Sequence, residues 1–421
     1  MTIPGATPHE LARSAAPAPV LPPIIARGVL ALVVALILIA TLTPTGTEIE
    51  PEFMRCIVCG QYGISDALVN IVLFAPLGLA LALNGRTGWR PVLYAALFSS
   101  TIELAQLVIP GRDSSIGDVC FNTLGAIVGQ LTLPAARRWL IPGDKAAARL
   151  SLAAGALAAL CLGATGWLMS PLYPPAPYHL WTTPDSPDYV WYDARVLRTS
   201  IGAQRLHTRD TVPGARELLI AGAPVSLVAL AGSDAPALGA LIVFRARHGR
   251  EVFLVGPDRD DLVLRYRTQS QRVGLYQPDL RVHGALQGVS QGDTLRITAR
   301  READGYCLAL NGTEACHLGF RIGDGWKLLW YPKHLRLWVQ RLLSWGWIAG
   351  LALPVGWWGR RRRETVLAAG LLAAGVLLVP RAVGLLPSTP AQVGAAVAGL
   401  LIGLVLKAAV SVRAVPRSSV R

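Results

Sequence analysis

Residues 91–130 read PVLYAALFSSTIELAQLVIPGRDSSIGDVCFNTLGAIVGQ, and this stretch decides the fold of the N-terminal part of the chain. Two apolar runs, 91–109 and 115–133, flank a short polar turn that begins at Gly111. Each run is about 20 residues long, and a helix of that length crosses the hydrocarbon core of a bilayer. The stretch therefore predicts two consecutive membrane helices that carry polar side chains.

The composition of the whole chain indicates a membrane protein. Of its 421 residues, 52% are hydrophobic and 16% are charged, and the mean hydropathy is +0.43. Soluble domains are about 25% charged. We predict a polytopic α-helical membrane protein with about eight transmembrane helices. The apolar runs that are long enough to span are 24–42, 67–84, 91–109, 115–133, 150–170, 337–358, 365–381 and 391–411.

The distribution of charge predicts the orientation. The net charge is +14, and most basic residues fall on one side if the eight runs alternate; Arg360–Arg363 is the densest group. Loops rich in Lys and Arg face the cytoplasm. This places both termini in the cytoplasm of a bacterial inner-membrane protein and accounts for the basic charge without a nucleic-acid partner. The predicted parts are a disordered cytoplasmic tail (1–23), a five-helix bundle (24–170), an extracytoplasmic domain (171–335), three further helices (336–411) and a cytoplasmic tail (412–421).

The long loop between the fifth and sixth runs has the pattern of an all-β sandwich. Short runs with alternating or β-branched residues recur there, separated by turn residues. The runs are 189–195, 218–230, 240–246, 251–255, 262–267, 272–276, 293–300, 306–310 and 326–330. Asn311-Gly312 predicts a tight hairpin.

The cysteines follow this topology. Cys307 and Cys316 lie opposite each other across the hairpin, at a separation that allows a disulfide in an oxidising compartment. Cys56 and Cys59 lie in the loop after the first run, on the same predicted side, and form either a local disulfide or free thiols. Their spacing is that of half a zinc site, but no second ligand pair follows. We predict no metal and no cofactor.

Polar residues gather near one end of the second, third and fourth runs. Ser99, Glu103 and Gln106 share one helical face, and Asp118 and Asn122 share another. The charge bias places these groups in the outer leaflet together with Asn70, with Arg112 in the adjoining loop as the partner of the carboxylates. The alternative is that these side chains only hold the helices together.

This region resembles the VanZ-like family, which is named for a membrane protein linked to teicoplanin resistance. The matching pattern runs from Asn70 to Gly129 and includes Phe74, Pro76, Gly78 and Gly125. The resemblance implies a cell-envelope role. The predicted ligand-binding residues are Asn70, Ser100, Glu103, Gln106, Arg112, Asp118 and Asn122.

The outer domain resembles concanavalin-like and laminin-G-like jelly rolls through its segment 293–311, DTLRITARREADGYCLALN. The resemblance implies glycan binding. Asp258, Asp260 and Asp261 form either a calcium site or an ordinary solvated turn, the latter being commoner. Aromatic residues such as Trp191 and Trp326 are either a sugar platform or, more often, core and membrane-interface residues.

These observations lead to a functional hypothesis and two alternatives. We expect an outward-facing polar pocket that binds a lipid-linked or glycan ligand, helped by a lectin-like domain, with an influence on glycopeptide susceptibility. The alternative is an enzyme acting on a polyprenyl-linked or cell-wall substrate, with Glu103 or Asp118 as the acid/base catalyst and Arg112 binding phosphate. A proton-coupled transporter is disfavoured because the charges cluster in one leaflet.

Overall fold

The computed structural model describes residues 22–44, 53–58, 60–186, 189–303, 305–332 and 335–413. The chain divides into two compact units, Met1–Pro142 and Gly143–Arg421. The predicted N-terminal tail, Cys59 and most of the predicted C-terminal tail lie outside the described residues. Each unit is described by itself below.

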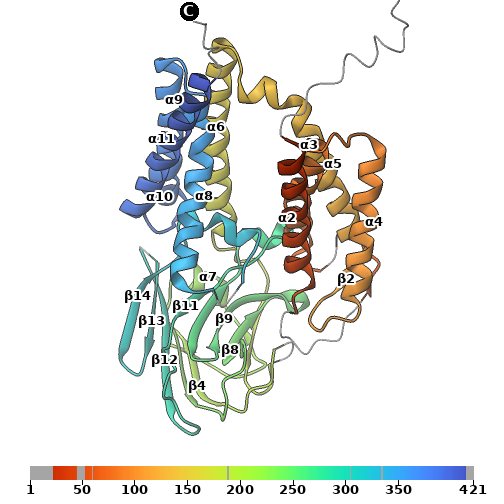
Figure 1. Ribbon diagram of the computed structural model, residues 1–421. Coiled ribbons are helices and arrows are strands. Elements are labelled where there is room, and N and C mark those ends of the chain that lie inside the picture. The colour runs from red at the N-terminus through yellow and green to blue at the C-terminus, as the bar shows by residue number, and fades with distance from the viewer. Residues whose placement is uncertain are drawn as a thin grey trace, which may run out of the picture. The chain divides into compact units, whose positions relative to one another are not determined.

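The first unit is a bundle of four helices (Figure 1). A short parallel pair of strands, β1 and β2, precedes α3 and α5 respectively. Phe74, Ile37 and Ile102 are fully buried at its centre. The elements are α2 (Pro23–Leu42), β1 (Phe53–Met54), α3 (Gly63–Leu83), α4 (Trp89–Gln106), β2 (Ser114–Ser115) and α5 (Ile116–Leu140).

Glycine allows α3 and α5 to touch along their backbones. A side-chain carbon added at Gly129 would lie 1.8 Å from the carbonyl oxygen of Ala75, and one added at Gly78 would lie 1.8 Å from that of Ala126. Small residues allow such close approach of membrane helices. Gly78 and Gly129 therefore serve the packing of α3 against α5.

In the described residues, the second unit contains the β domain and five helices outside that domain. Its helices are α6 (Asp144–Met169), α8 (Leu337–Trp357), α9 (Arg362–Leu377), α10 (Val379–Val383) and α11 (Pro390–Arg413). The sequence grouped the run 150–170 with the first bundle, whereas α6 packs on α8 and α9 within the second unit. Gly155 explains this difference, because a side-chain carbon there would lie 2.6 Å from the carbonyl oxygen of Ala368 in α9.

Six helices of the described chain are long and apolar enough to cross a membrane, where the sequence predicted about eight spans. The predicted spans 91–109 and 337–358 do form helices, α4 and α8, but these are not among the six. Polar side chains account for the difference: α4 contains Glu103 and Gln106, and α8 contains Gln340 and Arg341. The chain is a membrane protein that carries a β domain.

The β domain consists of two antiparallel six-stranded sheets, with strand orders β11-β10-β9-β8-β3-β6 and β14-β13-β12-β7-β4-β5 (Figure 1). Apolar residues that alternate along the strands fill the space between the sheets. The strands are β3 (Tyr178–Thr182), β4 (Arg195–Ile201), β5 (Gln204–Leu206), β6 (Thr211–Val212), β7 (Val225–Leu230), β8 (Ile242–Arg245), β9 (Glu251–Asp258), β10 (Asp261–Tyr266), β11 (Leu280–Val282), β12 (Thr294–Glu302), β13 (Gly305–Leu310) and β14 (Thr313–Leu318).

Several of the runs that were predicted to form strands have another conformation. The run 189–195 precedes β4, and the run 218–230 begins in α7 (Ala215–Ile220) before it reaches β7. The chain turns between them at Gly222, whose φ is +76°. The runs 272–276 and 326–330 overlap the 3-10 helices η2 (Gln269–Val273) and η3 (Ile322–Leu328); a third, η1, spans Arg247–Gly249. The strands β3, β5, β6 and β11 were not predicted from the sequence.

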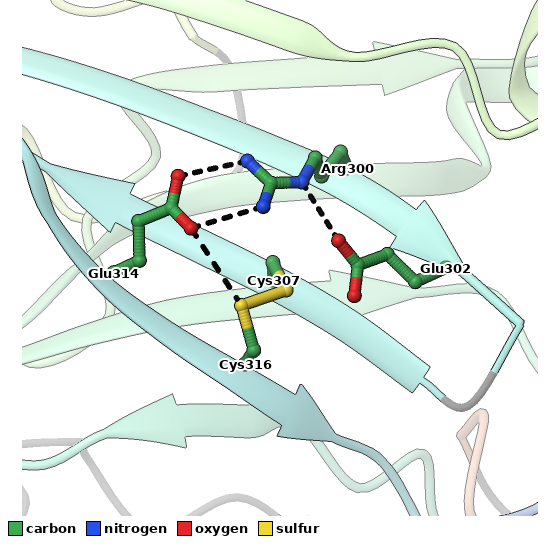
Figure 2. The surroundings of a disulfide bond; sticks show 5 residues. All are labelled: Arg300, Glu302, Cys307, Glu314 and Cys316. Carbon is green, nitrogen blue, oxygen red and sulfur yellow. Dashed lines mark hydrogen bonds and ion pairs between the residues drawn. A yellow bond between two sulfur atoms is a disulfide. The ribbon is translucent and has the colours of Figure 1, made fainter.

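The predicted hairpin is confirmed. Leu310 pairs with Thr313 across a two-residue turn in which Asn311 and Gly312 both have positive φ, the conformation that Asn-Gly favours. Cys307 and Cys316 are joined by a disulfide, with Cα atoms 4.0 Å apart. Figure 2 shows the disulfide beside the exposed ion pair of Arg300 with Glu314.

The core of the sandwich continues into the helices of its own unit. One cluster of buried side chains includes Leu264 from the sheets, Leu162 from α6 and Ile348 from α8. Hydrogen bonds also join η3 of the β domain to α8. Trp326 in η3 donates from Nε1 to Ser344 Oγ at 3.1 Å, and Ser344 donates to Asp324 at 3.0 Å. The buried Trp326 therefore serves packing, while Trp191 is 70% exposed.

Candidate functional site

The predicted polar face of α4 is buried in the first unit. Ser99 is fully buried, and Glu103 and Gln106 are each 6% exposed. Oε2 of Glu103 accepts a hydrogen bond from the backbone N–H of Ser115, at 2.9 Å. Ser115 lies in β2, directly before α5, so the short strand positions a peptide donor against this carboxylate.

A second polar contact joins the second turn of α3 to the first turn of α5. Nδ2 of Asn70 donates to Oδ1 of Asp118 at 2.7 Å. The charge of Asp118 interacts with those of Glu103 and Asp66. The structure thus brings together three of the predicted residues, Asn70, Glu103 and Asp118, and adds Asp66. The sequence contained a signal for Asp66, because it lies four residues before Asn70 on the same helical face.

Two buried amides complete this group. Asn122 donates from Nδ2 to Ser99 Oγ at 2.9 Å, and Gln106 donates from Nε2 to the carbonyl oxygen of Thr41 at 3.0 Å. Their acceptor atoms, Oδ1 of Asn122 and Oε1 of Gln106, have no hydrogen-bond partner among the described residues. Buried polar atoms are almost always paired in proteins. We call Asn70, Glu103, Gln106, Asp118 and Asn122 the polar cluster.

Arg112 lies elsewhere than the sequence predicted. It was expected to neutralise the carboxylates, but its guanidinium donates to the last carbonyl groups of α2. Nε and Nη2 bond to Thr43 O at 3.0 and 2.8 Å, and Nη2 bonds to Ala40 O at 2.8 Å. The physical reason is that a helix end presents unpaired carbonyl groups that attract a cation. Neither Glu103 nor Asp118 forms an ion pair with a basic side chain in the described part of the chain.

Ser100 also has a local partner. Its hydroxyl donates to Ala96 O at 2.9 Å, one turn back in the same helix. Its neighbour Ser99 instead makes the contact between helices, to Asn122. Ser100, a predicted ligand-binding residue, is therefore bonded within α4, whereas Ser99, which was not among the predicted ligand-binding residues, contacts Asn122 of the polar cluster.

The chemistry of the polar cluster is that of a hydrogen-bond acceptor. It presents two carboxylates, each of which accepts one hydrogen bond, and two amide oxygens that have no partner among the described residues, while Arg112 is bound to α2. Such a group suits a ligand that donates hydrogen bonds, through hydroxyl or ammonium groups, rather than a phosphate.

Two of the three acidic residues considered for a calcium site, Asp258 and Asp261, contact basic side chains in the described part of the β domain. Asp258 is paired with Arg281 at 2.6 Å, and Asp261 is paired with His283 at 2.9 Å. These acidic residues therefore belong to a turn held by side-chain contacts. Among the described residues, one group has the proximity of metal ligands, Glu302 with the two disulfide cysteines. Sulfur atoms joined to each other cannot act as thiolate ligands.

Comparison with known proteins bears on the first unit. A family model described as VanZ/LLP1 matches residues 27–137. The VanZ/LLP1 region extends from the first turn of α2 into the last turn of α5, so it contains the whole polar cluster. No curated protein and no solved structure matches the chain. A VanZ-like region combined with apolar helices indicates a membrane protein of the cell envelope.

Proposed function

We propose that the polar cluster of the VanZ/LLP1 region binds a hydroxyl- or ammonium-bearing head group of a lipid-linked or glycan component of the cell envelope. The observation that carries this proposal is the pair of buried amide oxygens, on Gln106 and Asn122, that find no hydrogen-bond partner in the described part of the chain. Leaving such atoms unpaired costs about 1–3 kcal/mol each, which a donating ligand would recover.

The elements of the polar cluster support a shared site. Gln106 ends α4, Asp118 opens α5 and Asn70 lies in the second turn of α3, so all three groups lie at one end of the bundle. The bias of basic residues toward the opposite loops favours an extracytoplasmic position for this end. A head group in the outer leaflet would reach it without crossing the membrane.

The β domain would take part as a glycan-binding module on the same side. Trp191 supports this role, because an indole that is 70% exposed offers a flat apolar surface for a sugar ring. Altered sensitivity to envelope-directed antibiotics, glycopeptides included, is the phenotype expected when the head group can no longer bind.

The test uses the full chain, purified in mild detergent, and mass spectrometry of the lipids and glycans that remain bound. Glu103→Gln and Asn122→Leu should each lower the amount of a co-purified species by about tenfold, the effect of losing one strong hydrogen bond. Thr101→Val is the matched control, since Thr101 lies on the exposed face of α4. An identical set of bound species in all folded variants would refute the proposal.

A further inference from the structure

A second candidate site lies in the other unit, where the chain leaves the membrane and enters the sandwich. A pocket of about 410 Å³ is lined there by Pro171, Leu172, Tyr173, Arg216, Ile220, Gln269 and Arg301. Its residues come from the segment after α6, from α7, from η2 and from β12. Neither the VanZ/LLP1 match nor the proposed function assigns a role to this pocket.

The ends of two apolar helices place the pocket at the membrane surface. The span of α6 ends at Met169, two residues before Pro171. The span that includes α10 ends at Val383, and a side-chain carbon added at the next residue, Gly384, would lie 3.9 Å from Nη2 of Arg301. The pocket is therefore bounded on two sides by chain that has just left the hydrocarbon region.

The charge of the pocket is positive. Arg216 is fixed by a hydrogen bond from Nε to Tyr173 O at 3.0 Å, and its Nη1 lies 3.4 Å from Glu217, whose side chain is 68% exposed. Because this contact is long and exposed to solvent, it neutralises little of the charge of Arg216. Among the described residues no carboxylate pairs with Arg301, whose positive charge acts on the hydroxyl groups of Tyr173 and Tyr306. In the described part of the chain, the two guanidinium groups that line the pocket are therefore opposed only by the exposed carboxylate of Glu217.

The rim of the pocket is apolar. Ile220 is 45% exposed, and Pro171 and Leu172 are half-buried beside it. An amphiphile whose charged head group met the arginines could lay its acyl chain along these side chains and the adjoining helix. Guanidinium groups are well suited to phosphate, because their N–H groups bond to two oxygens at once.

We propose that this pocket binds the phosphate of an anionic membrane lipid and so fixes the sandwich on the membrane surface. The site differs from the polar cluster in both chemistry and location, since it is cationic and lies in the second unit. The two proposals are therefore independent, and Glu103→Gln should leave lipid binding here unchanged.

The test is native mass spectrometry of the full chain in detergent, titrated with phosphatidylglycerol, phosphatidylcholine or inorganic phosphate. Arg216→Gln and Arg301→Gln should each weaken phosphatidylglycerol binding about tenfold, and phosphatidylcholine should bind weakly to every variant. Arg301→Lys keeps the charge and should retain most of the affinity. Arg205→Gln is the matched control, because Arg205 is an exposed arginine on the edge strand β5.

Three outcomes would overturn the proposal. The first is equal phosphatidylglycerol affinity for the wild type and the Arg216→Gln and Arg301→Gln variants. The second is equal affinity of the wild type for phosphatidylcholine. The third is complete displacement of the lipid by millimolar inorganic phosphate, which would assign the pocket to a soluble anion.

Discussion

The amide of Asn70 donates to the carboxylate of Asp118, 48 residues later in the sequence, at 2.7 Å and so joins the second turn of α3 to the first turn of α5. The same two helices, α3 and α5, touch through glycine farther along their length. A polar contact at one end and close backbone packing in the middle therefore hold one helix pair.

A double-mutant cycle should detect the Asn70–Asp118 contact. Because each side chain is the other's hydrogen-bond partner, Asn70→Ala and Asp118→Ala should lower the free energy of unfolding by less together than the sum of their separate effects. The coupling should be about 1 kcal/mol, given the modest values measured between membrane helices. Thermal unfolding in detergent measures this coupling energy. A double variant whose loss of unfolding free energy equals the sum of the two single losses would contradict the contact.

Gly129→Val should destabilise the first unit. The new side chain would collide with the backbone at Ala75, so α3 and α5 would have to separate. Overpacking of this kind costs about 1–3 kcal/mol. Gly28→Val in α2 is the matched control, since no atom lies within 4 Å of the position where its side chain would begin. Equal melting temperatures for the two variants would refute the packing argument.

Arg112→Gln should reduce stability rather than remove ligand binding. The substitution deletes charge-assisted hydrogen bonds to the carbonyl groups of Thr43 and Ala40. The loss should be about 1–2 kcal/mol, and Arg112→Lys should recover part of it. The readouts are thermal unfolding and the amount of co-purified ligand. A stable Arg112→Gln protein that has lost its ligand would instead place the guanidinium in the binding site.

Asp279 should make the β domain sensitive to acid. Burial raises the pKa of Asp279, but hydrogen bonds and charge from Arg281 outweigh it and hold the pKa below its usual 3.8. A carboxyl group whose pKa is lower in the folded than in the unfolded protein stabilises the fold. This stabilisation is fully present above the pKa of the unfolded state and is lost as the pH falls through the pKa of the folded state. Asp279→Asn should therefore lower stability at neutral pH by about 2 kcal/mol, the effect of losing a charge-assisted hydrogen bond, because Arg281 keeps its ion pair with Asp258.

The same variant should flatten the acid limb of the stability curve below about pH 4, because the titrating group is gone. Asp210→Asn is a suitable control, since the side chain of Asp210 is 57% exposed and its contact with His207 spans 3.4 Å. Parallel pH profiles for wild type and Asp279→Asn between pH 5 and pH 2 would show that Asp279 does not carry the effect.

The disulfide between Cys307 and Cys316 provides a test of sidedness in cells. If the β domain is extracytoplasmic, the pair should form in vivo and resist maleimide labelling until a reductant is added. Cys120 and Cys161, the two free cysteines of the described chain, are first replaced by Ala. Labelling of Cys307 or Cys316 without reductant, at natural expression, would argue that the domain faces the cytoplasm.

Local patterns in the sequence predicted local features well. The Asn311-Gly312 turn forms because both residues tolerate positive φ, and the faces of α4 and α5 are buried as their helical spacing predicts. The strand predictions for 272–276 and 326–330 were wrong because a short apolar run does not distinguish a strand from a buried 3-10 turn. In η3, Asp324 accepts from the backbone N–H of Arg321 at 2.8 Å and starts the turn instead.

Contacts that depend on distant partners could not be read from the chain. Arg112 was paired with the nearest carboxylates, but the carbonyl groups at the end of α2, about 70 residues earlier, compete for it. The partner of α6 was likewise undetermined, because Gly155 indicates a close neighbour without saying that Ala368 provides it. The residues of the polar cluster were identifiable from sequence, whereas the absence of a cation among them was not.

The continuous core between the sandwich and its helices has a mechanical consequence. Leu264, Leu162 and Ile348 belong to one buried cluster, so the β domain has no flexible stalk on α6 or α8. A lectin on a tether samples a volume, whereas a domain fused in this way keeps one height and one tilt above the bilayer. A ligand of the β domain would have to reach that fixed level, and tilting of α6 or α8 would also move the sheets that share their buried core.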